Sequence, residues 1–200
     1  MTRTDFLRKL SEGYVDLQGG TVSASSIVID RPTIILNGTI NGVPGDATFK
    51  VKSDSLTLRN VETSGQYGIR LDGKGLELDL KKVIHRGGLG LIHGAEGCGV
   101  SSLSMVDCDV TDAARGVYIA SFDVRNVTLI RCFFLNVVNP SGHAVAVYLG
   151  RDDGVNSRKA QEDGRMGNYV LHGVHVQNVR GQKANGLMLM GDDVLAHSLI

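Results

Sequence analysis

The feature that most constrains this chain is a short strand-like motif that recurs along almost its whole length. Each copy alternates apolar and polar side chains, as in Leu103-Ser104-Met105. The copies begin at Ile34, Leu56, Leu76, Leu103, Val127, Tyr169 and Val194, with steps of 22, 20, 27, 24, 42 and 25 residues. Self-similarity at this period indicates a repeat architecture, in which each unit buries its apolar face against its neighbours.

A second strand-like segment lies between successive copies of the first. Its copies are 48–51, 69–71, 91–93, 117–119, 145–147 and 187–189, and a glycine precedes four of the six. We expect these glycines to adopt turn conformations that are closed to other residues. No helical pattern separates the strands, so we predict a parallel solenoid whose coils stack at about 4.8 Å.

One inward ladder is visible in the sequence. Five positions after the start of the first strand, five of the seven copies have Thr39, Val61, Cys108, Cys132 and Val174. The copy at Leu76 departs from this pattern, with Lys81 at that position and Val83 two residues later. We interpret Cys108 and Cys132 as buried small side chains in neighbouring coils.

The ends of the chain differ from its middle. Residues 4–12 predict a short helix with Phe6, Leu7 and Leu10 on one stripe, and we assign 1–13 as a cap over the open end of the solenoid. The solenoid domain is assigned to 14–200, with an insertion at 151–167 that is expected to emerge on one face. No cap follows the last copy, which we interpret as a fragment or as an end that another subunit covers.

Composition narrows the classes of function. The 21 basic and 21 acidic residues cancel, so a nucleic-acid partner is not expected. We find no signal peptide and no apolar run long enough for membrane insertion, and we expect synthesis in the cytoplasm. The three cysteines and six scattered histidines have no spacing typical of a metal site, so no metal and no cofactor are expected.

The coils resemble the pectate-lyase-like superfamily of right-handed parallel β-helices. Segments 56–61 and 127–132, and the opening Gly19-Gly20-Thr21-Val22 before 27–29, are the residues that carry this resemblance. It implies an all-β, right-handed parallel β-helix of about seven coils with a short N-terminal capping helix. The superfamily includes polysaccharide lyases, polygalacturonase-type hydrolases and phage tailspikes or related virion spikes, the last commonly being parallel trimers.

In this fold the outward side of the second strand is the usual glycan groove. The predicted alternation turns Arg70, Ile92, Tyr118, Ala146 and Met188 outward. We predict that Arg70, Asp72, Tyr118 and Tyr148 line a substrate-binding strip, with aromatic faces for sugar rings and charged groups for hydroxyls or carboxylates. Arg151 and Asp152 in the insertion are further binding candidates. The alternative is an ordinary solvated sheet face.

Glycoside hydrolysis needs two carboxylates roughly 5–10 Å apart. Asp107 and Asp109 alternate within one predicted strand, which would place them on one side about 7 Å apart. Gly191-Asp192-Asp193 is similar to the Gly-Asp-Asp of polygalacturonases, where the aspartates serve acid and base roles. The Gly-His-Gly and Arg-Ile-Lys elements that should follow it are absent from this sequence, so a simple turn is the alternative.

The sequence thus leaves two classes of function open. The favoured one is a structural and recognition module that resembles a phage or phage-derived spike and contacts cell-surface polysaccharide. We expect it to be virion-associated and to work as a homo-oligomer, a trimer, or in a larger assembly. The alternative is a polysaccharide-degrading enzyme, either a glycoside hydrolase or a polysaccharide lyase. The missing signal peptide and the incomplete catalytic set favour the first.

Overall fold

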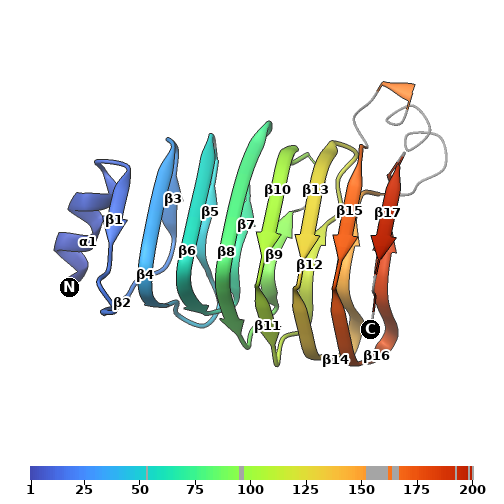
Figure 1. Cartoon of the computed structure of the whole chain (residues 1–200). Coiled ribbons are helices and arrows are strands. Elements are labelled where there is room, and N and C mark those ends of the chain that lie inside the picture. The colour runs from blue at the N-terminus through green and yellow to red at the C-terminus, as the bar shows by residue number, and fades with distance from the viewer. Residues whose placement is uncertain are drawn as a thin grey trace.

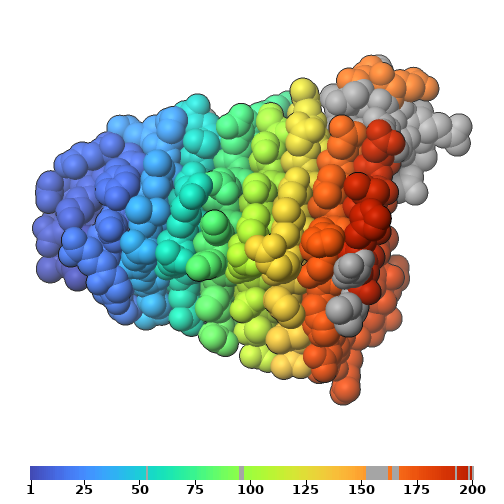
Figure 2. Space-filling model, in the orientation of Figure 1, coloured from blue at the N-terminus to red at the C-terminus, as the bar shows by residue number. Residues whose placement is uncertain are grey.

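The computed structural model describes residues 1–52, 54–94, 97–151, 162–163, 167–191, 193–197 and 199. In them the chain forms an all-β parallel solenoid of about seven turns with a single short N-terminal helix, α1 (Arg3–Leu10). Figure 1 shows the coils side by side from α1 to β17, and Figure 2 shows them as successive bands of colour. The predicted fold class, a solenoid with a short N-terminal helix, is confirmed.

Pairing between successive coils builds three parallel sheets, and five long strands bend from one sheet into the next. The first sheet contains β1 (Tyr14–Asp16), β10 (Val100–Val106), β13 (Val124–Ile130), β15 (Tyr169–His172) and β17 (Val194–His197). The second contains β2 (Thr21–Ser23) and β11 (Asp109–Thr111). The third contains β3 (Ile27–Ile29), β5 (Ala47–Val51), β7 (Tyr67–Leu71), β9 (Gly90–Gly94) and β12 (Arg115–Ile119). The strands β4 (Thr33–Asn41), β6 (Ser55–Ser64) and β8 (Leu76–Arg86) join the first sheet to the second, and β14 (Phe133–Leu149) and β16 (His175–Leu189) join the second to the third.

The core consists of ladders of apolar side chains, one residue from each coil. In the first sheet one such ladder contains Leu58, Leu80, Met105, Leu129 and Leu171, all fully buried. Burial of each side chain of this size contributes roughly 1.5–3 kcal/mol. The alternation within each strand therefore fixes which side chains face outward.

A sharp corner between the first and second sheets uses one left-handed residue per coil. Asn37, Asn60, Lys82, Asp107 and Arg131 have φ between 50° and 55°. Asparagine and aspartate tolerate this conformation, whereas lysine and arginine are strained in it. Neighbouring coils are bonded at this corner, because Asn60 Nδ2 donates to Asn37 Oδ1 over 3.0 Å.

A second corner, between the second and third sheets, is likewise formed by left-handed residues. Asp112, Asn136 and Asn178 have φ between 54° and 59°. Asn136 Nδ2 donates to Asp112 Oδ1 over 3.0 Å, and Asn178 Nδ2 donates to Asn136 Oδ1 over 2.7 Å. These amide ladders satisfy polar side chains at the bend while they hold one coil to the next.

The register corrects two copies of the predicted repeat. Leu56 pairs with Thr33 and with Leu78, so these copies begin there rather than at Ile34 and Leu76. The steps from Thr33 to Leu103 become 23, 22 and 25 residues, which is more regular than the sequence suggested. The departure at Lys81 disappears, because Val83 now follows its strand start by five residues and pairs with Val61.

Two of the glycines that precede third-sheet strands provide space rather than a turn. Gly68, Gly116 and Gly186 do not have positive φ, so the predicted turn conformation is wrong for them, whereas Gly90 has a φ of 147°. A Cβ on Gly116 would lie 2.2 Å from the backbone oxygen of Ala146, and one on Gly68 would lie 2.9 Å from the backbone oxygen of Leu91. Glycine is therefore required there because the backbone of the next coil approaches the position of its missing Cβ.

The N-terminal helix packs against the first coil. Thr2 caps it, since its Oγ1 accepts a hydrogen bond of 3.1 Å from the Asp5 backbone N–H, and Phe6 and Leu10 are buried in the core. In the described part of the chain, no helix is long and apolar enough to cross a membrane. Of the predicted insertion, residues 152–161 and 164–166 lie outside the described residues.

Candidate functional site

The outward side of the third sheet carries long polar and aromatic side chains at a single register. We call this set the outer row: Lys50, Arg70, His93, Tyr118, Tyr148 and Met188, from β5, β7, β9, β12, β14 and β16. For the first five members of the row, the residues on either side of the member are buried, so alternation directs the member itself outward. Parallel pairing spaces the members about 4.8 Å apart.

The rings of this face stack on one another. We call Tyr67, His93, Tyr118 and Tyr148 the aromatic stack, in which successive ring centroids are 4.5, 5.6 and 4.8 Å apart. The guanidinium carbon of Arg115 also lies 4.2 Å from the centroid of the Tyr118 ring. The stack therefore leaves ring edges rather than ring faces for a ligand, which differs from the expected stacking of sugars on aromatic faces.

The N-terminal half of the outer row is electrostatically balanced. Lys50 Nζ lies 3.0 Å from Asp46 Oδ1, and Arg70 binds both oxygens of Asp72 over 2.8 and 2.7 Å. Hydrogen bonds from Ser26 and then Lys50 lower the pKa of Asp46 to about 2. A carboxyl group with so low a pKa stays ionised at neutral pH and is a poor general acid.

His93 connects the charged and aromatic parts of the row. It is half-buried, and its Nδ1 has no hydrogen-bond partner among the described residues. Burial lowers its pKa, and the charges of Arg115 and Arg70 lower it further, so the ring is neutral at neutral pH. The sequence prediction had turned Ile92 outward in its place, but Ile92 pairs with Ile69 and is 1% exposed.

Ala146 was also predicted to face outward and is instead fully buried, while Tyr148 occupies the outward position of that coil. Sequence reasoning identified Arg70, Asp72, Tyr118 and Tyr148 as one strip, and the structure brings them together on this face. It missed Lys50, Tyr67 and His93. These residues could have been found from the correct register of each coil, but aligning the coils by their glycines gives a wrong register.

Two cationic side chains, Arg115 and Lys183, lie beside the C-terminal half of the row. Asn185 Nδ2 lies 2.9 Å from His143 Nε2, and the His143 ring meets the Tyr148 ring edge-on at 6.2 Å. Burial, Arg115 and then Lys183 lower the pKa of His143. Among the described residues, neither Arg115 nor Lys183 has a carboxylate oxygen within 4.0 Å.

The predicted catalytic pair lies elsewhere, at the corner between the first and second sheets. Asp107 is a left-handed corner residue after β10, and Asp109 begins β11, so the expectation that both lie in one strand is wrong. Arg131 binds the Asp107 carboxylate over 2.6 and 3.1 Å and lowers its pKa. Burial raises the pKa of Asp109; the charge of Arg86 opposes this shift, and the charge of Asp107 adds to it.

The remaining predicted site residues do not join this pair. Asp193 is exposed and precedes β17, whereas Asp107 follows β10, so the two carboxylates lie at opposite ends of the first-sheet strands. Arg151 follows β14, with its guanidinium carbon 5.3 Å from the centroid of the Phe122 ring. Asp152 and Asp192 lie outside the described residues.

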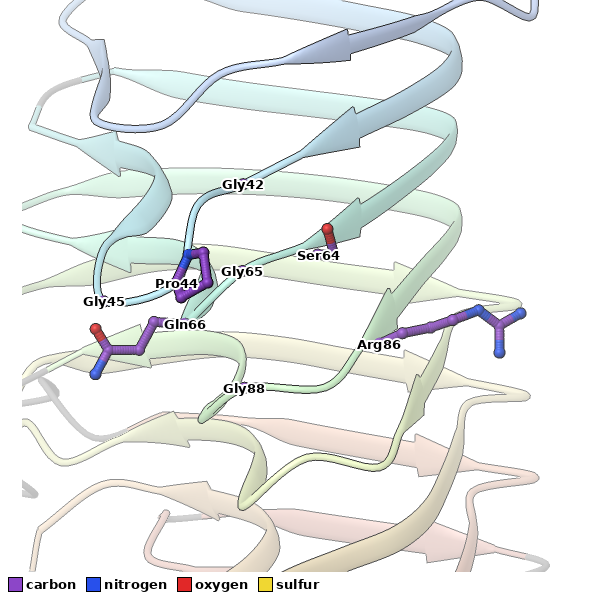
Figure 3. Close-up of a pocket in the computed structure, with 8 residues that line it drawn as sticks. All are labelled: Gly42, Pro44, Gly45, Ser64, Gly65, Gln66, Arg86 and Gly88. Atoms are coloured by element: carbon purple, nitrogen blue, oxygen red, sulfur yellow. The ribbon is translucent and has the colours of Figure 1, made fainter.

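A cavity of about 410 Å³ opens beside the second corner, and half of the residues that line it are glycines. Figure 3 shows Pro44 and Gln66 together on one side of it, while the side chain of Arg86 points away. Arg86 Nε instead donates to Glu62 Oε1 over 3.0 Å. Because no titratable side chains converge there, we do not assign a function to this cavity.

Comparisons with family models, curated proteins and solved structures find no match to this chain. Within the described residues, no three His, Cys, Asp or Glu side chains are placed to hold a metal ion.

Proposed function

We propose that this solenoid is a recognition module that binds polysaccharide along the outer row of its third sheet. The observation that carries the proposal is the row itself, which continues from coil to coil at one register. An extended polymer needs a line of contacts rather than a pocket, and solenoids provide extended binding surfaces. Cationic side chains and tyrosine hydroxyls are suitable hydrogen-bond donors for sugar oxygens.

The rigidity of the row favours binding. Ring stacking restrains Tyr118 from both neighbouring coils, and a bidentate ion pair restrains Arg70. Side chains that are ordered before a ligand arrives lose less conformational entropy when it binds. The carboxylates of this face are already ion-paired, which supports recognition rather than acid–base chemistry at this surface.

The corner carboxylates favour a second candidate, a polysaccharide-degrading enzyme. The pKa of Asp107 is lowered and that of Asp109 is raised, although the two groups are close enough to interact. Two carboxyl groups with pKa values moved apart are typical of an acid paired with an ionised partner. The ion pair between Asp107 and Arg131 weakens this candidate, because it occupies the carboxylate that would have to react.

A second part of the proposal concerns the superfamily and the oligomeric state of the chain. We propose that the solenoid belongs to the pectate-lyase-like superfamily and serves a virion-associated spike that functions as a trimer. The similarity of segments 56–61 and 127–132 to the coils of that superfamily supports it. A mass measurement of the purified protein by light scattering would show a trimer, and a monomer would contradict this part of the proposal.

The experiment mixes the protein with dextran, alginate and purified bacterial capsular polysaccharides and follows polymer size by chromatography over hours. The proposal predicts that an intact polymer co-elutes with the protein. Shortened chains would instead support the enzyme, and Asp109→Asn should then abolish the shortening.

A matched pair of variants locates the binding surface. Arg70→Gln removes an outer-row cation, and Arg59→Gln removes a first-sheet arginine that is likewise 2.7 Å from an aspartate. Loss of a charged hydrogen bond predicts affinity about tenfold weaker for Arg70→Gln and unchanged for Arg59→Gln. Equal affinities for the two variants would contradict the assignment to the third sheet.

A further inference from the structure

We infer that an anion-binding subsite, formed by Arg115, His143 and Lys183, lies beside the C-terminal half of the outer row and takes the carboxylate or sulfate group of an acidic sugar. The inference rests on the proposed function and adds the chemical class of the polysaccharide to it. The feature that points to this subsite is the uneven pairing of charges along one face.

The two halves of the row differ in their counter-ions. In the N-terminal half each cation has its own carboxylate, Asp46 for Lys50 and Asp72 for Arg70. In the C-terminal half, as far as the described residues extend, Arg115 and Lys183 have none within 4.0 Å. An external anion would supply the missing counter-ion here, as the aspartates do in the N-terminal half.

The three side chains of the subsite lie on neighbouring strands, Arg115 on β12, His143 on β14 and Lys183 on β16. Arg115 pairs in register with Val145, His143 pairs with Lys183, and Asn185 pairs with Val145 from the other side. Arg115 is held over the Tyr118 ring, and its Nε lies 3.5 Å from the backbone oxygen of His143. The Asn185 amide contacts His143 Nε2, so the imidazole orientation is also fixed. Donors that are oriented in advance, as Arg115 and His143 are, are suited to an oxyanion, and the exposed Lys183 adds a cation next to His143.

The surroundings of His143 predict how the subsite responds to pH. Arg115 faces His143 from β12, Lys183 and Asn185 face it from β16, and Tyr148 contacts it from its own strand. The two cations help to keep the free imidazole neutral. A bound anion would offset them and favour a proton on His143, so affinity for an acidic polymer should rise as the pH falls.

The test compares dextran, carboxymethyl-dextran and dextran sulfate, which share one backbone, by affinity electrophoresis. We expect at least one acidic dextran to bind about tenfold more tightly than dextran, and the preferred derivative identifies the group as carboxylate or sulfate. Lys183→Gln changes an exposed side chain and should remove most of this preference. Lys81→Gln, at an exposed lysine of the first sheet, should retain it.

Two further variants make the result specific. Arg115→Gln should also remove the preference, and His143→Gln should abolish the gain in affinity between pH 7.5 and pH 5.5. Equal binding of all three dextrans, or full preference in Lys183→Gln, would overturn the subsite. Either result leaves the proposed function standing, because that is judged by co-elution with the wider panel and by Arg70→Gln.

Discussion

The corners of this solenoid and the outer row of its third sheet use the same repetition for different ends. At the corners, Asn37 and Asn60 or Asp112 and Asn136 bond from coil to coil and hold a left-handed backbone. In the outer row, stacking from coil to coil holds side chains at the surface instead. A repeat thus turns each position into a row, and the environment of the row decides whether it contributes stability or binding.

The largest effect is expected where this comparison is sharpest, at two adjacent residues. Val117 is fully buried and faces the core, whereas Tyr118 faces outward. Val117→Asp buries an unpaired charge and should cost at least about 4 kcal/mol, enough to unfold most of the protein. Tyr118→Phe keeps the stacked ring and should melt within a few degrees of the parent. Thermal melts followed by circular dichroism test both, and a parent-like melt for Val117→Asp would show that the register is wrong.

The next effect comes from a buried histidine in the second sheet. His85 Nδ1 lies 3.0 Å from Thr63 Oγ1, and burial lowers its pKa to about 4. In the unfolded chain the pKa is about 6.5, so the unfolded state takes up the proton first as the pH falls. Stability should therefore be full above about pH 6.5 and decrease by up to about 3 kcal/mol toward pH 4.

Urea unfolding at pH 7.5 and at pH 4.5 measures this loss. His85→Phe with Thr63→Val replaces the polar pair by apolar groups and should show a much smaller pH dependence over the same interval. If the double variant loses as much stability as the parent, another group carries the dependence.

Smaller changes in stability, of opposite sign, are expected for two different corner residues. Asn136→Ala removes bonds to Asp112 and Asn178 and places alanine in a left-handed conformation, which should cost about 1–2 kcal/mol. Lys82→Gly relieves strain at the other corner and should raise stability by up to about 1 kcal/mol. Urea midpoints measure both changes, and a loss of stability in Lys82→Gly would mean that corner strain is not significant.

The fold was largely predictable because the core repeats. Alternating pairs such as Leu103 and Met105 mark the first strand in every coil, and burial on one side makes that signal strong. Where consecutive residues are apolar, as at Ile34-Ile35-Leu36, alternation is lost and the predicted register slips by one residue. In the strand that contains Leu76, Leu78 and Leu80, the slip is two residues.

The site was predicted less completely for a physical reason. The sequence pattern places Gly90 and Gly116 at the same position of their coils. In the structure Ile92 pairs with Val117, so Leu91 is the residue at the position of Gly116. Because of that shift of one residue, the predicted alternation places His93 inward, and the sequence does not reveal the aromatic stack that His93 joins. The ion pair between Asp107 and Arg131 was also out of reach, because it depends on a left-handed corner that alternation does not reveal.

The central claim is that polysaccharide lies along the third sheet, and the five tyrosines of this chain allow a direct test. Tyr67, Tyr118 and Tyr148 belong to the aromatic stack, Tyr14 is 50% exposed on the first sheet, and Tyr169 is fully buried. Hydroxyl-radical oxidation, read by mass spectrometry with and without the co-eluting polymer, reports which rings become covered. The account predicts reduced oxidation of the three stacked tyrosines and unchanged oxidation of Tyr14. Unchanged oxidation of those three rings in the presence of bound polymer would contradict it.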